Sequence, residues 1–386
     1  MQTLEGVQVY IVQASVDPVN CFEHYLRVFD YSFTGKEYIY RIKLWEDNLR
    51  SYYYSNLNSH DGSFDIIDQY TVLTEAEAEA DRNGNNDGPQ SDFPACPDLP
   101  TPANAANPAP DSWDWRDYGV QTPVTAQSCG TCWAHAAANF VGSYLLSRNQ
   151  PTAALNPLVT VSPQPLIDCS PPSQIVNGKE LYVHSPDPCD GGGTINSVKF
   201  MGLAAFPLTN NQSFPYVDNS PPDVPPVNRQ NPLCNGYPAD VSPQYYVPST
   251  INYRSCCLTE NQLKQAIYDT GPIVVSMSCG DIDTKLPGPG GYTGRSEPYC
   301  NTTNRNTGGQ LPAGQLSFNH GMLVVGYRTT APGQGYFILK NSWGMFWNNL
   351  GYGNWAFSAN QDKLFQSTCG ISDQVLVPGS KALHLA

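Results

Sequence analysis

The chain has 386 residues, of which 12 are cysteine and 40% are apolar, and its formal net charge is −14 at pH 7. That surface charge repels nucleic acid and anionic membranes, so neither is expected as a partner. Twelve cysteines favour an oxidising compartment, and no apolar run of about 18 residues is present that would span a membrane.

The N-terminal region, residues 1–83, carries a helical pattern between residues 22 and 56. Six side chains recur there at steps of three and four, near one helix face: Glu37, Arg41, Trp45, Asn48, Tyr52 and Asn56. Taken alone, the pattern fits an ordinary amphipathic helix with one Glu–Arg pair. The first residues have no basic start, unbroken apolar segment or small-residue cleavage site, so a secretory signal is expected to be missing from this sequence.

Residues 84–111 differ sharply in composition from the regions on either side. They are rich in Gly, Asn, Pro, Ala and Asp, and such a stretch cannot bury enough apolar surface to fold by itself. We therefore expect an exposed linker between the region 1–83 and a larger domain over 112–386.

Cys129 and Cys132 stand just before a stretch, residues 133–140, whose composition favours a helix. A cysteine at a helix start meets the positive end of the backbone dipole, which favours thiolate over thiol. Cys132 is therefore the candidate nucleophile. A zinc half-site is a weaker interpretation, because a second C-x-x-C or a His-x₃₋₅-His is missing, and a thioredoxin-like redox pair lacks its βαβ context. No metal or cofactor is expected.

Downstream, His320 opens an apolar run and Asn341 closes a strand-like segment. A thiol, an imidazole and an amide in this chain order are the parts of a Cys-His-Asn acyl-transfer site. The stretch Cys129-Gly-Thr-Cys132-Trp133, followed by this histidine and asparagine, resembles the papain family of cysteine proteases. Thr131 stands where that family has Ser or Ala.

Further motifs in the family's order strengthen the resemblance: Asp114-Trp115-Arg116, Leu166-Ile167-Asp168-Cys169, Cys189-Asp190-Gly191-Gly192 and Cys369-Gly370. The resemblance implies three disulfides, Cys129–Cys189, Cys169–Cys234 and Cys300–Cys369, which would leave Cys132 as a thiol. It also implies an α+β fold of two lobes, a mostly helical lobe with Cys132 and a sheet-rich lobe with His320 and Asn341.

The helical pattern of residues 22–56 resembles the ERFNIN helix of cathepsin L-type inhibitory prosegments, although Val72 stands where the family has an aspartate. This implies a zymogen whose residues 1–83 fold over the enzyme and whose linker runs along the cleft, with cleavage between residues 95 and 112. Acid at pH 4–5 is expected to weaken carboxylate contacts such as Glu37–Arg41 and to loosen the prosegment.

The resemblance also implies a role for each site residue. Cys132 attacks the scissile carbonyl, His320 exchanges the proton, and Asn341 orients the imidazole. Gln127 is the candidate side-chain donor to the oxyanion, although it precedes Cys132 by five positions where the family usually has six. Gly191, Gly192 and Trp343 are expected to line the substrate site, with Trp343 also shielding the Asn–His hydrogen bond.

These residues predict a cysteine endopeptidase that acts on proteins and peptides, with its own prosegment as an intramolecular inhibitor. A carboxypeptidase or other exopeptidase remains an alternative, as does a catalytically silent peptide-binding or storage protein. We expect a secreted or lysosomal or vacuolar monomer, with glycosylation sequons at Asn211 and Asn301. The remaining histidines, His135 and His184 among them, are expected to be surface or packing residues.

Overall fold

The computed structural model describes residues 3–58, 64–74, 77–78, 84, 98–148, 160–176, 179–217, 234, 237, 239, 242–247, 254–256, 258–278, 285–286, 318–331, 334–357 and 374–378. The helices in these ranges are α1 (Leu4–Val16), α2 (Pro18–Val28), α3 (Gly35–Asn58), η2 (Trp115–Tyr118), α5 (Cys132–Ser147), α6 (Gln164–Cys169), η3 (Pro188–Asp190), α7 (Thr194–Ala204) and α8 (Glu260–Thr270). The strands are β1 (Phe64–Asp65), β2 (Ser112–Asp114), β3 (Ser173–Val176), β4 (Lys179–Tyr182), β5 (Arg254–Cys256), β6 (Ile273–Met277), β7 (Lys285–Leu286), β8 (His320–Ala331), β9 (Gln334–Lys340), β10 (Tyr352–Ala356) and β11 (Gln374–Val377).

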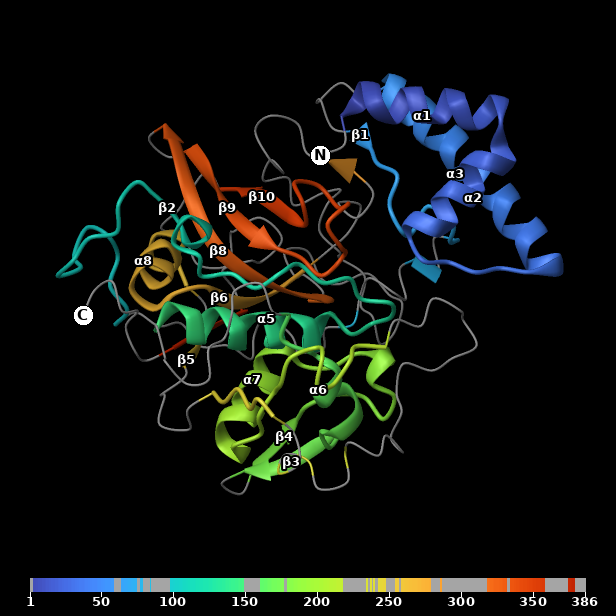
Figure 1. The fold of residues 1–386 in the computed structure, drawn as a ribbon. Helices are drawn as coiled ribbons and strands as arrows, with labels where there is room; N and C mark the ends of the chain where they lie inside the picture. The colour runs from blue at the N-terminus through green and yellow to red at the C-terminus, as the bar shows by residue number, and fades with distance from the viewer. Residues whose placement is uncertain are drawn as a thin grey trace, which may run out of the picture.

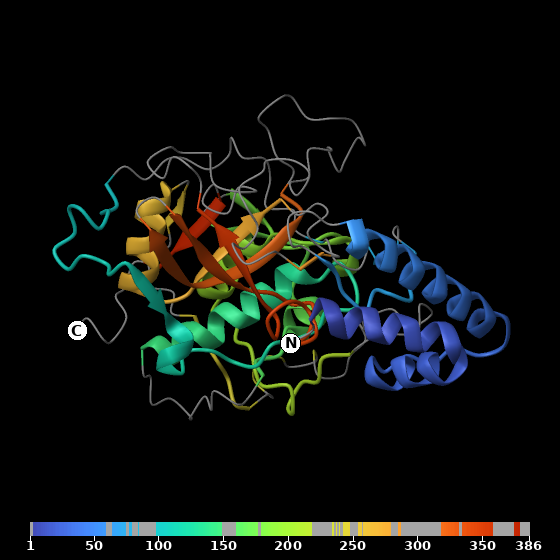
Figure 2. The ribbon, with the colours of Figure 1, turned by 90° about the horizontal axis from the view of Figure 1, so that it is seen from above.

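Helices α1, α2 and α3 form a bundle of their own beside the rest of the molecule (Figures 1 and 2). The fully buried Trp45 belongs to the apolar cluster that holds them together. The helical pattern expected between residues 22 and 56 is divided between two helices. The division follows α2, where Asp30 adopts a left-handed conformation with φ of 56°. On α3 the predicted face is confirmed, because Arg41, Trp45 and Asn56 are buried.

The larger part of the chain is built on a seven-stranded antiparallel sheet. Its strand order is β10-β9-β8-β6-β11-β5, and β2 also pairs with β8. Successive residues of β6 and β8 belong alternately to two core clusters: Val275 and Val324 lie in the cluster that includes α8, and Val274 and Leu323 in the cluster that includes α5. Because both faces of these strands are covered, residues 273–275 of β6 and 322–325 of β8 form continuous apolar runs.

Helix α5 packs against β8 and β6 on one face of the sheet, and α6, α7 and the hairpin of β3 and β4 lie beyond it (Figure 1). This places the first residue of α5, Cys132, in a largely helical lobe, and the first residue of β8, His320, in the sheet. The division into a helical and a sheet-rich lobe agrees with the expectation from the sequence.

The region 98–111 is largely exposed, as its composition predicts, but it is tied to helix α8 by hydrogen bonds. Gln262 donates to the carbonyl of Leu99 at 3.0 Å. Gln265 donates to the carbonyl of Asn107 at 3.0 Å and accepts from the backbone N–H of Ala109 at 2.9 Å. Two glutamine side chains thus hold a segment that has little apolar surface to bury. Residues 85–97 of the expected linker lie outside the described ranges.

Candidate active site

Cys132 is the first residue of α5 and its side chain is fully buried. The preceding cysteine of the motif, Cys129, is bonded to Cys189, whereas Cys132 is not in a disulfide. The thiol therefore sits where the backbone N–H groups and dipole of α5 favour its anion. The neighbouring disulfide makes Cys129 unavailable as a nucleophile.

The predicted disulfide pairing is confirmed where the structure describes both partners. Cys129–Cys189 connects the loop before α5 to η3, and Cys169–Cys234 follows at the end of α6. The third predicted pair, Cys300–Cys369, lies outside the described residues.

His320 and Asn341 lie at the ends of two neighbouring strands, β8 and β9. The distance from His320 Nε2 to Asn341 Oδ1 is 2.8 Å. Asn341 Oδ1 also accepts the backbone N–H of Ser342 at 2.8 Å, which identifies this atom as the oxygen of the amide. Nε2 of His320 must then carry a proton, and Nδ1 is the ring atom left for proton exchange with a nucleophile.

Trp343 lies over this hydrogen bond. Its ring centroid is 4.6 Å from that of His320, and its side chain is 1% exposed. The Trp347 ring packs perpendicular to it, with the two ring centroids 5.5 Å apart. The indole keeps water away from the His–Asn pair, which strengthens the bond in a medium of low dielectric. The shielding role expected of Trp343 from the sequence stays a prediction.

Gln127 is buried, and both ends of its side-chain amide are engaged. Its Oε1 accepts from the hydroxyl of Ser342 at 2.6 Å, and its Nε2 donates to the carbonyl of Cys129 at 3.0 Å. Its backbone N–H donates to the carbonyl of Ser342 at 2.8 Å. The amide nitrogen is therefore directed toward the loop that carries Cys132, despite the short spacing. Ser342, which orients this amide, was not singled out by the sequence motifs.

Gly191 and Gly192 follow η3 and approach other groups closely. A Cβ on Gly192 would lie 2.6 Å from the Trp133 ring, and Gly191 has φ of 110°, so both positions require glycine. The N–H of Gly192 donates to the carbonyl of Gly84 at 2.7 Å. Gly84, at the start of the predicted linker, therefore already accepts the backbone N–H of Gly192 that was expected to bind substrate.

The segment that follows α3 covers the same region from the other side. Tyr70 packs edge-on against Trp343 at 6.4 Å, and Nε2 of Gln69 lies 3.5 Å from the carbonyl oxygen of Gln127. Phe29, the residue that follows α2, packs against Phe346, and their ring centroids are 5.0 Å apart. The N-terminal region thus lies directly on the residues around the candidate site.

Three buried polar side chains near the site, those of Lys340, His135 and His184, were not expected from the sequence to take part in catalysis. Lys340 donates to both the carbonyl and the hydroxyl of Thr122, and burial lowers its pKa to about 7. His135 contacts the hydroxyl of Thr125 through Nδ1, and burial lowers its pKa to about 3. His184 lies with each ring nitrogen near a backbone carbonyl. His135 and His184 were expected to be surface or packing residues, and both are buried.

Asn211, the first predicted sequon, is half-buried and its side-chain oxygen accepts the backbone N–H of Tyr216 at 2.6 Å. Asn301 lies outside the described residues. Within the described part of the chain, no helix is long and apolar enough to cross a membrane, and no three His, Cys, Asp or Glu side chains are arranged to hold a metal ion.

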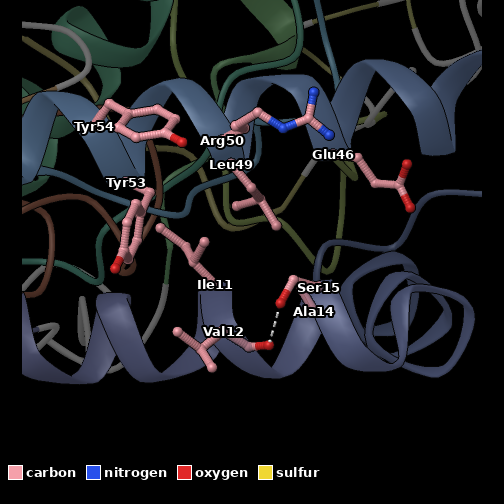
Figure 3. A pocket seen from close by; sticks show the side chains of 9 residues that line it. All are labelled: Ile11, Val12, Ala14, Ser15, Glu46, Leu49, Arg50, Tyr53 and Tyr54. Atoms are coloured by element: carbon pink, nitrogen blue, oxygen red, sulfur yellow. Dashed lines mark hydrogen bonds between the residues drawn. The ribbon is translucent and has the colours of Figure 1, made fainter.

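A pocket of about 410 Å³ lies between α1 and α3 (Figure 3). Its lining comes from two helices of the bundle: Ile11, Val12, Ala14, Ser15, Glu46, Leu49, Arg50, Tyr53 and Tyr54. None of these residues belongs to the region of Cys132, His320 and Asn341, so this pocket is separate from the candidate active site.

Comparison with known proteins agrees with this geometry. A family model described as "Papain family cysteine protease" matches residues 109–379. Digestive cysteine proteinase 3 of Homarus americanus is 26% identical over 349 residues, which cover 89% of this chain and 89% of the relative. Cathepsin K of Mus musculus is 28% identical over 270 residues, which cover 70% of this chain and 64% of the relative.

Two solved structures have a similar fold at low sequence identity. The digestive procathepsin L2 proteinase from the larval midgut of Tenebrio molitor superimposes with a TM-score of 0.63 at 23% identity, over 93% of this chain and 99% of that one. A recombinant stem bromelain precursor gives a TM-score of 0.63 at 23% identity, over 94% of this chain and 99% of that one. Coverage this high includes the N-terminal helices.

Proposed function

Because the chain belongs to the papain family of cysteine proteases and has the expected α+β fold with a helical prodomain, we propose that it is the zymogen of a cysteine endopeptidase. One observation carries the proposal. The His320–Asn341 hydrogen bond lies at the start of strand β8, against which α5 packs with Cys132 at its first position. A proton acceptor and a thiol at a helix start are the parts that peptide-bond hydrolysis by a thiolate requires.

The reaction begins with attack by Sγ of Cys132 on the scissile carbonyl carbon. His320 holds the thiol proton on Nδ1 as part of an ion pair, and Asn341 keeps the ring oriented through Nε2. The negative charge that develops on the carbonyl oxygen is held by the backbone N–H of Cys132 and the side-chain amide of Gln127. The C–N bond then breaks, the leaving amine takes the proton from His320, and a thioester remains.

Hydrolysis of the thioester completes the cycle. His320 accepts a proton from water, whose oxygen attacks the thioester carbonyl, and the C–S bond breaks to release the carboxylic acid. The thiolate of Cys132 and the protonated His320 are restored together.

We further propose that residues 1–83 inhibit the enzyme and that removal of the linker activates it. The bond between Gly192 N–H and the Gly84 carbonyl supports this, because it uses a backbone donor that an extended substrate needs. The contact of Tyr70 with Trp343 supports it as well. Cleavage between residues 95 and 112 would separate these parts, and the two disulfides suit secretion or delivery to an oxidising lumen.

The test is a pair of substrates given to the full chain after processing at pH 4–5. A blocked fluorogenic dipeptide amide reports endopeptidase action, and a peptide with a free carboxyl terminus reports carboxypeptidase action. We expect the blocked substrate to be cut, and Cys132→Ala to abolish cutting. Cleavage of the free-carboxyl peptide alone would make the enzyme an exopeptidase. If the wild type is correctly folded and processed but cuts neither substrate, the protein is a catalytically silent homologue.

A further inference from the structure

The loop from Thr125 to Thr131 carries Gln127 and leads into Cys132, and one of its sides is fixed by the residues after Asn341. The carbonyl of Thr125 accepts the N–H of Gly344 at 3.0 Å, and the N–H of Gln127 donates to the carbonyl of Ser342 at 2.8 Å. Between them, Ala126 forms a bridge with Trp343. This side holds the loop to the His–Asn pair.

The opposite side of the loop is held by two aromatic residues, His135 and Tyr216. Nδ1 of His135 lies 2.8 Å from the hydroxyl of Thr125. The hydroxyl oxygen of Tyr216 accepts the backbone N–H of Ser128 at 3.0 Å and lies 3.1 Å from its side-chain hydroxyl. The His135 and Tyr216 rings meet edge to face at 4.7 Å. These contacts fall on both sides of Gln127 in the sequence.

Each of the two residues is itself held by the fold. His135 is 1% exposed and lies one turn after Cys132 on α5, so its position is tied to that of the nucleophile. The backbone N–H of Tyr216 donates to the side chain of Asn211 at 2.6 Å. The loop has only five positions from Gln127 to Cys132, so contacts on both flanks restrict where its backbone lies, while Ser342 and the Cys129 carbonyl bond the Gln127 amide itself.

We propose that His135 and Tyr216 are positioning residues for the oxyanion site: by holding Thr125 and Ser128, they keep the Gln127 amide beside Cys132 in a short loop. This rests on the proposed function, since it assigns these residues a part in the same reaction. They touch neither substrate nor the reacting atoms. Their effect is transmitted through Gln127, whose donor acts on charge that develops only in the transition state.

The first test is Tyr216→Phe, which keeps the ring and removes the hydroxyl that holds Ser128. The full chain is processed with pepsin at pH 4, and pepsin is then inhibited with pepstatin. We expect kcat to fall about tenfold with little change in KM, which is less than the 10²–10³-fold typical of losing an oxyanion donor outright. The matched control is Tyr237→Phe, which removes a hydroxyl that bonds the carbonyl of Pro207 elsewhere in the same lobe.

Two readouts distinguish positioning from a general loss of structure. Alkylation of Cys132 by iodoacetamide forms no oxyanion, so its rate should be unchanged in Tyr216→Phe, whereas affinity for a peptide aldehyde should fall together with kcat. In Gln127→Ala, the further change Tyr216→Phe should have no effect on kcat, because the donor it positions is gone. Equal effects of Tyr216→Phe and Tyr237→Phe, or multiplicative losses in the double variant, would overturn the inference.

His135 is tested by a second pair of variants. His135→Leu removes the contact with Thr125 and should lower kcat as Tyr216→Phe does, and His135→Asn, which retains a polar atom at the Nδ1 position, should restore most of it. Failure of His135→Asn to recover more activity than His135→Leu would contradict the role given to this hydrogen bond. If the wild type is inactive and its Cys132 is not alkylated, the proposed function is refuted. If the wild type is active and the His135 and Tyr216 variants are unaffected, only the positioning role is refuted.

Discussion

The Gln127 side chain has its orientation fixed from both ends. Ser342 donates to its oxygen and the Cys129 carbonyl accepts from its nitrogen, so the amide cannot flip without losing both bonds. The donor is thus preorganised before substrate arrives, and preorganised donors are what stabilise an oxyanion most effectively. Because the structure holds Gln127 in this way, the spacing of five positions to Cys132 does not rule out Gln127 as the side-chain donor to the oxyanion.

We predict that Gln127→Ala lowers kcat by about 10²–10³-fold with little change in KM, because the lost hydrogen bond forms fully only in the transition state. Steady-state kinetics on the processed enzyme provide the measurement. Gln174→Ala, on strand β3 and away from the site, is the matched control and should leave kcat unchanged. A fall of less than tenfold would mean that another donor serves the oxyanion.

The sequence predicted the residues that lie within short motifs and missed those joined only by the fold. Cys132, His320 and Asn341 each stand in a motif of a few residues, so their chemistry could be inferred without coordinates. Tyr216 lies 88 positions from Ser128, and no periodicity or motif connects them. Such a contact arises only when the chain has folded. The sequence therefore could not predict that Tyr216 holds the loop that carries Gln127.

At the scale of single elements, α3 is held to the segment after it by one buried cation. Arg41 bonds Glu77 through two nitrogens at 2.8 Å each, Glu37 at 2.6 Å, and the carbonyl of Val72 at 3.3 Å. The guanidinium therefore binds two carboxylates and one backbone carbonyl at once. The bond to Arg41 lowers the pKa of Glu77 to about 2.

The expectation that acid at pH 4–5 weakens carboxylate contacts such as Glu37–Arg41 does not extend to the second carboxylate on Arg41, that of Glu77. The pKa of Glu77 in the folded chain lies below its ordinary value of 4.5, so the pair contributes stability above about pH 4.5 and loses it as the pH falls toward 2. At pH 4–5 most of this contribution remains. The Arg41–Glu77 contact therefore still holds α3 to the segment after it at pH 4–5.

We predict that Glu77→Gln makes the proenzyme mature faster, and at a higher pH, than the wild type, because the neutral amide cannot pair with Arg41 as a carboxylate does. Gel analysis of processing between pH 3 and pH 7 gives the pH of half-maximal conversion. Asp47→Asn removes an exposed pair with Arg50 on the same helix and should leave that pH unchanged. Equal midpoints for Glu77→Gln and the wild type would contradict the role of this ion pair.

Element boundaries were less predictable than element faces. The three- and four-residue spacing of α3 predicted which side chains are buried, because that pattern is a direct consequence of helix geometry. The same spacing gave no sign of the break between Val28 and Gly35, since a left-handed residue such as Asp30 has no periodic signature.

At the scale of the whole molecule, the prosegment shares a core with the enzyme. Ile66, Tyr70 and Ala78 belong to the same apolar cluster as Trp343 and residues of the central sheet. The three helices of the bundle have a separate cluster around Trp45. The segment after α3 therefore packs on the apolar residues beside the candidate active site, and the helical bundle is joined to that segment.

We predict that Tyr70→Ala in the full chain raises the residual peptidase activity of the unprocessed protein at pH 7 by at least about tenfold. Loss of a buried aromatic contact worth about 2–3 kcal/mol would lower the equilibrium constant for docking of the prosegment by a factor of about 30–150. Initial rates are measured while gels show the chain intact. Tyr54→Ala, which removes an exposed ring of α3, should leave the protein inert. Equal latency in both variants would show that Tyr70 does not contribute.

Alkylation of Cys132 before and after processing tests the central claim most directly. The full chain is exposed to iodoacetamide at pH 7, processed at pH 4–5, and exposed again, and the labelled cysteines are identified by peptide mapping. We predict almost no label on Cys132 in the proenzyme, where its side chain is fully buried, and rapid labelling after processing, in parallel with the loss of peptidase activity. Peptidase activity that survives with Cys132 fully alkylated, or is lost with the label on another cysteine, would contradict the account.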